Sequence, residues 1–147
     1  MDLRKLRING KRLQEAIEES AKIGATPNKG LIRCAATPED KIGRDLLMKW
    51  YKEVGCEVTV DEMGNMFAVR PGKKRELGAV LTGSHFDTQK PGGRFDGILG
   101  VLGALEVMRT IAENKVLQQT DLLSRFLHSQ QSRQLNGLQL KTTFYRH

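Results

Sequence analysis

Residues 78–113 have the sequence GAVLTGSHFDTQKPGGRFDGILGVLGALEVMRTIAE, and this stretch decides the fold. Residues 78–83 are uncharged and mostly apolar, which predicts a strand that is fully buried. A glycine-rich loop follows. Residues 96–113 then carry apolar side chains on more than one face, which predicts a helix enclosed within a larger domain. A buried strand, a loop and a buried helix in this order indicate a fold of the α/β class.

Two helices are predicted upstream of this stretch. An apolar stripe over residues 10–23 predicts the first, and the turn-forming residues 24–30 end it. The second begins at Thr37, whose side chain can cap it, with Pro38 in the first helical position. Gly55 is placed to end this helix in a left-handed conformation.

Short strands are predicted between the second helix and residue 78. Apolar and polar residues alternate over 56–60, and 66–69 is a short apolar stretch, with turn-forming residues at 63–65 between them. We therefore expect helices packed on a mixed sheet.

The composition changes near Val116. Residues 116–147 are rich in Gln, Leu, Ser and Arg and nearly free of acids. Apolar residues within 122–127 predict a short amphipathic helix, and the alternation over 138–144 predicts a strand. We expect one domain over residues 1–115 and an atypical tail over 116–147.

Composition limits the classes of protein that fit this chain. A length of 147 residues suits one domain, and 39% hydrophobic with 28% charged residues is a globular composition. No apolar run is long enough to span a bilayer, so we expect no membrane partner. The basic residues 1–7 lack the apolar stretch of a secretory signal; a basic lead-in to the first helix or an organelle-targeting segment both fit them. Cys34 and Cys56 lack zinc-binding spacing and predict free thiols, so we expect a cytoplasmic location.

The formal net charge of +7 raises the question of nucleic-acid binding. Acidic and basic residues interleave in the predicted helices, as in residues 11–19. The few aromatic residues do not alternate with basic ones, so they form no platform on which bases could stack. We expect a basic surface and no nucleic-acid partner.

Three residues in and after the predicted strand can carry chemistry. His85 and Asp87 lie at its carboxyl end, where open α/β sheets place ligand sites. The imidazole could ligate a divalent metal while the carboxylate holds its tautomer, although a histidine bonded only to its neighbours fits equally. Asp96 stands where the apolar helix begins, where it could cap the helix or bridge two metal ions.

Three segments strongly resemble the N-carbamoyl-L-amino-acid hydrolases, β-ureidopropionases and allantoate amidohydrolases of the zinc-dependent aminoacylase/carboxypeptidase superfamily: 83–89, 92–97 and 100–102. The resemblance covers about residues 8–113 and includes 24–26, 44–45, Trp50, 55–56 and 61–67. It implies that residues 1–115 form the incomplete N-terminal portion of a zinc-aminopeptidase-like catalytic domain.

The resemblance also implies roles for single residues. His85 would ligate one metal, Asp96 would bridge two, and Asp87 would be the catalytic carboxylate behind His85. We also assign Gln89 to substrate binding. The cofactor would be zinc or another divalent metal, with two ions in the intact family. The resemblance also implies a homodimer for the intact family. The reaction implied is hydrolysis of a linear amide, in N-carbamoyl amino acids or related ureido acids, by a metal-activated water.

The family pattern is not complete in this sequence. Its paired glutamates, further metal-binding histidines, and the arginine and asparagine that bind substrate cannot be placed, and no Glu follows Asn114. His128 and His147 belong to no recognisable motif. A catalytic zinc site has three or more protein ligands, and loss of a general base costs about 10²–10⁴-fold in rate. We therefore expect a truncated or frame-shifted product without activity of its own. The alternative is a non-catalytic remnant that binds a partner protein or a full-length homologue, because its apolar helix needs cover.

Overall fold

The computed structural model describes residues 3–116 and 119–127. The strand predicted over 138–144, and the residues His128 and His147, lie outside these ranges. Within them the chain forms a short 3-10 helix, three α-helices and four strands. In chain order these are η1 (Leu3–Lys5), α1 (Gly10–Ser20), α2 (Pro38–Glu53), β1 (Glu57–Val60), β2 (Met66–Arg70), β3 (Val80–His85), α3 (Ile98–Glu113) and β4 (Leu122–Leu127).

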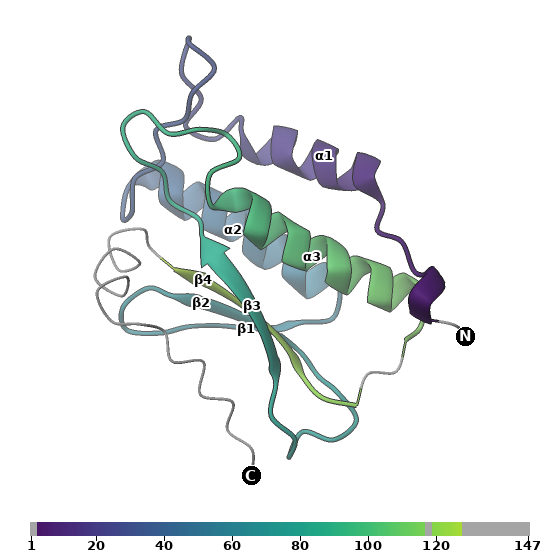
Figure 1. Cartoon of the computed structure of the whole chain (residues 1–147). Coiled ribbons are helices and arrows are strands. Elements are labelled where there is room, and N and C mark those ends of the chain that lie inside the picture. The colour runs from purple at the N-terminus through teal and green to yellow at the C-terminus, as the bar shows by residue number, and fades with distance from the viewer. Residues whose placement is uncertain (1–2, 117–118, 128–147) are drawn as a thin grey trace, which may run out of the picture.

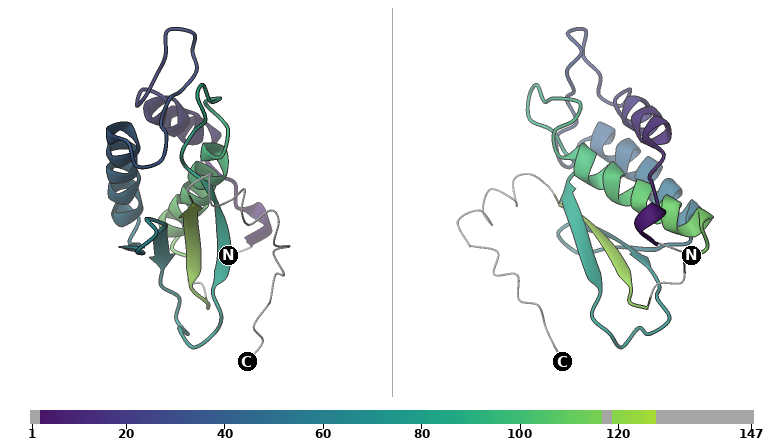
Figure 2. Two further views of the ribbon diagram at one scale, coloured as in Figure 1. Left: turned by 90° about the vertical axis from the view of Figure 1, so that its left-hand side faces the viewer. Right: turned by 45° about the vertical axis from the view of Figure 1, so that its right-hand side comes forward.

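The strands form one mixed sheet in the order β1-β2-β4-β3. β1 and β2 are an antiparallel hairpin, and β2 also pairs antiparallel with β4. β3 and β4 run parallel, joined through α3 as a crossover connection. The helices gather on one side of the sheet (Figures 1 and 2). The predicted α/β class, with helices packed on a mixed sheet, is confirmed.

The caps of α2 are those that the sequence predicts. The Thr37 side chain accepts a hydrogen bond from the Asp40 N–H, and Pro38 occupies the first turn. Gly55 follows the helix with φ of 78°, in the left-handed region that glycine adopts without strain. α1 begins at Gly10 as predicted and ends at Ser20, a few residues earlier than predicted.

The core lies between the helices and the sheet, and a buried tyrosine links its layers. The Tyr51 hydroxyl of α2 donates to the Val101 carbonyl of α3 at 2.9 Å and lies 3.1 Å from the Ser124 hydroxyl of β4. An ion pair joins α1 to α3: Arg12 binds the buried Glu106 through two bonds of 2.7 and 2.8 Å. These contacts fix each helix against its neighbour.

Two predictions for the strands are wrong. β3 is not fully buried, because it is the edge strand of the described sheet, and Val80 and Leu81 are each 59% exposed. Residues 122–127 form the strand β4 and no helix. β4 pairs with β2 on one side and with β3 on the other, and these ladder hydrogen bonds outweigh a weak amphipathic pattern. The predicted boundary at residue 115 stays a prediction, and β4 shares the sheet of the strands that precede it.

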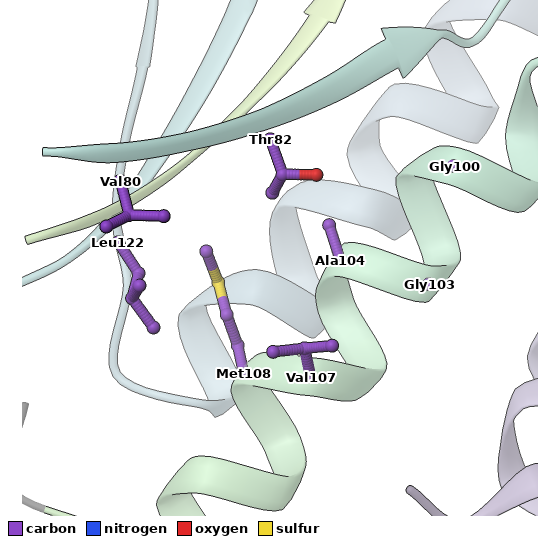
Figure 3. Close-up of a pocket in the computed structure, with 8 residues that line it drawn as sticks. All are labelled: Val80, Thr82, Gly100, Gly103, Ala104, Val107, Met108 and Leu122. Atoms are coloured by element: carbon purple, nitrogen blue, oxygen red, sulfur yellow. The ribbon is translucent and has the colours of Figure 1, made fainter. Parts of the chain in front are cut away.

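α3 is covered by the sheet and by α1, and part of its surface is exposed to solvent. It packs on β3, β4 and α1, while Leu99 and Val107 are 47% and 46% exposed. An apolar groove of about 330 Å³ lies between α3 and β3, where Met108 extends from the helix toward the strands (Figure 3). Its lining carries no titratable group, so it offers no general acid or base. No helix in the described ranges has both the length and the apolar character to cross a membrane.

Candidate metal site

His85 is the last residue of β3 and pairs in register with Leu127, the last residue of β4. The two parallel strands therefore end together, and the loop to α3 leaves from that edge (Figure 1). The carboxyl ends of parallel strands are where α/β sheets place ligand sites. His85 thus stands at the edge of the sheet where its imidazole can meet residues of the following loop.

The imidazole of His85 is held by the main chain of Asp87. Its Nδ1 lies 2.9 Å from the Asp87 carbonyl oxygen, to which it can only donate. The proton on Nδ1 leaves Nε2 with its lone pair free for a metal. The Asp87 carboxylate is buried and its Oδ1 lies 3.8 Å from Nδ1, so the nearer support of the ring is the carbonyl.

Asp96 approaches the other ring nitrogen. Its Oδ1 lies 3.5 Å from Nε2 of His85, and its side chain is 56% exposed. A good N–H···O hydrogen bond measures about 2.7–3.2 Å, so this pair is too long to be one. Two ligands about 2.1 Å from one tetrahedral zinc ion lie about 3.4 Å apart. The observed separation therefore fits two donors to a single ion.

Gly97 makes this approach possible. It precedes α3 as its N-cap residue with φ of 70°, so Asp96 is not the cap that its position in the sequence allowed. A Cβ on Gly97 would lie 2.4 Å from both Cε1 and the carbonyl oxygen of His85. Only a residue without a side chain lets the start of α3 lie against the imidazole.

Arg33 lies beneath the same loop, and our reading of the sequence missed it. Its side chain is fully buried, with its guanidinium carbon 4.0 Å from the centre of the Phe86 ring. Burial lowers the pKa of Arg33 to about 10, while the charges of Asp40 and Asp87 act in the opposite direction. In the sequence, Arg33 is marked only as a single basic residue after the apolar pair Leu31 and Ile32, which does not indicate a buried role.

A second loop borders the loop of residues 86–97, which joins β3 to α3 and is called the site loop. Leu31 pairs with Gly92 through two main-chain hydrogen bonds of 2.9 and 2.8 Å, which brings residues 24–32 beside residues 88–93. A hollow of about 620 Å³ lies between the loops, with Asn28 and Lys90 among its lining residues. Gln89 is exposed on the site loop next to Lys90.

The described residues offer two side chains that could act as metal ligands. His85 and Asp96 fit as two donors, one imidazole nitrogen and one carboxylate oxygen, and both types suit zinc. In residues 3–116 and 119–127 there is no group of three or more His, Cys, Asp or Glu that could hold a metal ion. The predicted roles of His85, Asp87, Asp96 and Gln89 stay predictions.

Comparison with known proteins gives consistent results for sequence and fold, although no family model matches the sequence. An N-carbamoyl-L-amino-acid amidohydrolase of Rhizobium meliloti is 46% identical over 105 residues, which are 71% of this chain and 25% of that protein. A ureidoglycolate hydrolase of Oryza sativa is 35% identical over 99 residues, 67% of this chain and 20% of that protein.

A solved structure shares the fold. The hydantoinase/carbamoylase family amidase of Burkholderia ambifaria superposes with a TM-score of 0.81 and 45% identity, covering 82% of this chain and 30% of that one. The chain thus spans less than a third of the length of each of these relatives. Sequence and fold together place it in the family of the N-carbamoyl-L-amino-acid amidohydrolases, the hydantoinase/carbamoylase amidases, as a partial match to longer members.

Proposed function

We propose that this chain carries part of the divalent-metal site of a hydrolase that cleaves carbon–nitrogen bonds in linear amides. The observation that supports this most is the 3.5 Å between Nε2 of His85 and Oδ1 of Asp96, with Nδ1 already bonded to a carbonyl. The names of the related amidohydrolases agree with that chemistry.

Each residue of the site has a distinct part in the proposal. His85 would bind zinc or a similar ion through Nε2, and the exposed carboxylate of Asp96 has a second oxygen that could reach a second ion. Asp87 would hold the ring from behind through its carbonyl. A divalent ion bound there supplies positive charge that polarises the scissile carbonyl and acidifies water.

The proposed substrates are N-carbamoyl amino acids or related ureido acids. They join a neutral urea-like group to a carboxylate, and the hollow beside the site loop is lined by the Asn28 amide and the Lys90 ammonium. An amide suits the first group and a cation the second. We propose Gln89 as a further contact because it is exposed on the same loop.

The described residues hold no group of three His, Cys, Asp or Glu that could bind a metal ion, and the paired glutamates of the family cannot be placed in the sequence. We therefore propose that the 147-residue chain alone does not turn over, and that activity needs further residues. The test is ammonia release from N-carbamoyl-β-alanine with zinc present. We expect no release above the buffer rate; turnover that needs zinc and is lost in His85→Ala would contradict the proposed incompleteness.

A second candidate function is pairing with a polypeptide that carries the rest of such a domain. The position of β3 at the edge of the described sheet and the adjoining apolar groove favour it, because an edge strand is a template for another strand. The partner we commit to is the segment of the Rhizobium meliloti relative that lies outside its match to this chain. Mixed with that segment, the chain should form a one-to-one complex in light scattering. Two separate species, or a dimer of this chain alone, would contradict the pairing.

A further inference from the structure

Arg33 contacts the residues on both sides of Asp87. Its Nη2 donates to the Phe86 carbonyl at 3.2 Å, and its own N–H donates to Oγ1 of Thr88 at 2.8 Å. In return, its carbonyl accepts the N–H of Thr88 at 2.9 Å. The segment that holds His85 in place is thus tied to one buried residue.

The bond from Thr88 to Arg33 fixes the carbonyl that His85 uses. The N–H of Thr88 and the C=O of Asp87 belong to the same peptide unit, which is planar and trans, so they point in opposite directions. When that N–H points at the Arg33 carbonyl, the Asp87 carbonyl must face the other way, where it accepts from His85. The direction of the imidazole therefore depends on where the Arg33 main chain lies.

The Arg33 side chain anchors that main chain. Its Nη1 donates to the Ser20 carbonyl at 3.0 Å at the end of α1, and its guanidinium stacks on the Phe86 ring. A Cβ on Gly43 of α2 would lie 2.4 Å from the Phe86 ring, so the backbone of α2 packs directly against the ring on which Arg33 stacks. The cation also faces the buried Asp87 carboxylate, whose charge needs compensation.

We propose that Arg33 is a positioning residue that aims Nε2 of His85 at Asp96 through the Asp87 peptide. The metal part of this statement rests on the proposed function, whereas the orientation of the ring does not. Arg33 touches neither the ion nor the substrate in this account.

The test reads the His85 ring directly by long-range ¹H–¹⁵N NMR of the metal-free full chain, which distinguishes a proton on Nδ1 from one on Nε2. The variants are Arg33→Met, Thr88→Val and the conservative Thr88→Ser. Arg12→Met is the matched control, because it removes a cation whose ion-pair partners are Glu106 and Glu113 of α3. Urea unfolding of each variant reports the structural cost separately, and cobalt(II) titration reports the affinity for metal.

We expect the unchanged chain and Thr88→Ser to carry the proton on Nδ1, and Arg33→Met and Thr88→Val to show a mixture of tautomers. Cobalt affinity should fall about 10–100-fold in those two variants, as for other groups that support metal ligands. Arg12→Met should lose stability and keep the His85 pattern. If Arg33→Met does not fold, Thr88→Val decides.

An unchanged tautomer in both Arg33→Met and Thr88→Val would overturn the proposal, as would an equal change in Arg12→Met. Failure of the unchanged chain to bind cobalt would instead count against the proposed metal site. In that case the tautomer of the His85 imidazole, measured by NMR, still tests the positioning role of Arg33.

Discussion

Nε2 of His85 and Oδ1 of Asp96 lie 3.5 Å apart although one residue ends a strand and the other precedes a helix. The crossover connection from β3 to β4 brings them together, because the loop to α3 must begin and end at the same edge of the sheet. Two features maintain the distance: the Asp87 carbonyl behind the ring and the bare backbone of Gly97 beside it. The proposed metal site therefore depends on the loop as much as on the two side chains.

The first prediction concerns Gly97. Substitution by alanine places a methyl group against the His85 ring and adds backbone strain of about 1–3 kcal/mol at a positive φ. Gly97→Ala should lower the free energy of unfolding in urea and shift the His85 imidazole resonances. Gly103→Ala is the matched control in α3, where an added Cβ meets nothing within 4 Å. It should be neutral or stabilising by about 1 kcal/mol, and equal losses in the two variants would contradict the account.

The second prediction concerns acid stability. Burial alone would raise the pKa of Glu106, but hydrogen bonds from Arg12 and the Asn9 N–H outweigh it, so its pKa lies below the ordinary 4.5. The folded state then binds this proton less readily than the unfolded state. The pair stabilises the fold above about pH 4.5, and its contribution is lost as pH falls through that value and below.

The variant Glu106→Gln should lose about 1.5–3 kcal/mol at neutral pH, because it removes hydrogen bonds to a charged group. The loss should shrink as the pH is lowered toward 3. Glu15→Gln, at an exposed ion pair with Lys11, serves as the control and should change stability little. A loss in Glu106→Gln that is the same at every pH would show that Glu106 stabilises the fold without its charge.

The third prediction concerns the two thiols. Cys56 is 7% exposed, and burial raises its pKa to about 11, whereas Cys34 is half-buried. Cys34 should therefore react with a thiol reagent in the folded chain at pH 8 well before Cys56 does. Fast labelling that persists in Cys34→Ala would contradict this order.

The raised pKa of Cys56 also has a consequence at alkaline pH. The unfolded thiol ionises near the ordinary value of 9.0, while the folded thiol keeps its proton to about 11. Stability that is present below pH 9 should decline as pH rises from 9 to 11. The decline should be shallower in Cys56→Ala, as measured by urea unfolding at each pH.

Local patterns in the sequence predicted those parts of the fold that depend on local interactions. Thr37, Pro38 and Gly55 mark the ends of α2 because cap chemistry acts within one helical turn. The strand, loop and helix around His85 were also predicted, since their apolar patterns are strong. The resemblance of residues 83–97 to known amidohydrolases predicted a metal-binding role for the loop, and that role stays a prediction.

Features that depend on distant partners could not be read in this way. The exposure of β3 follows from its place at the edge of the sheet, and β4 is a strand because it lies between two others. Arg33 is important through contacts with residues 86 and 88, which lie more than fifty positions along the chain. A single sequence contains no pattern that joins such positions.

Titration of the full chain with zinc tests the central claim most directly, with isothermal calorimetry as the measurement. We predict one weak site that His85→Ala and Asp96→Asn each weaken at least about tenfold, as losses of metal ligands. Asp45→Asn, an exposed carboxylate paired with Lys41 on α2, should leave the isotherm unchanged. Zinc binding that is unaffected by His85→Ala and Asp96→Asn, or that is absent from the unchanged chain, would contradict the account.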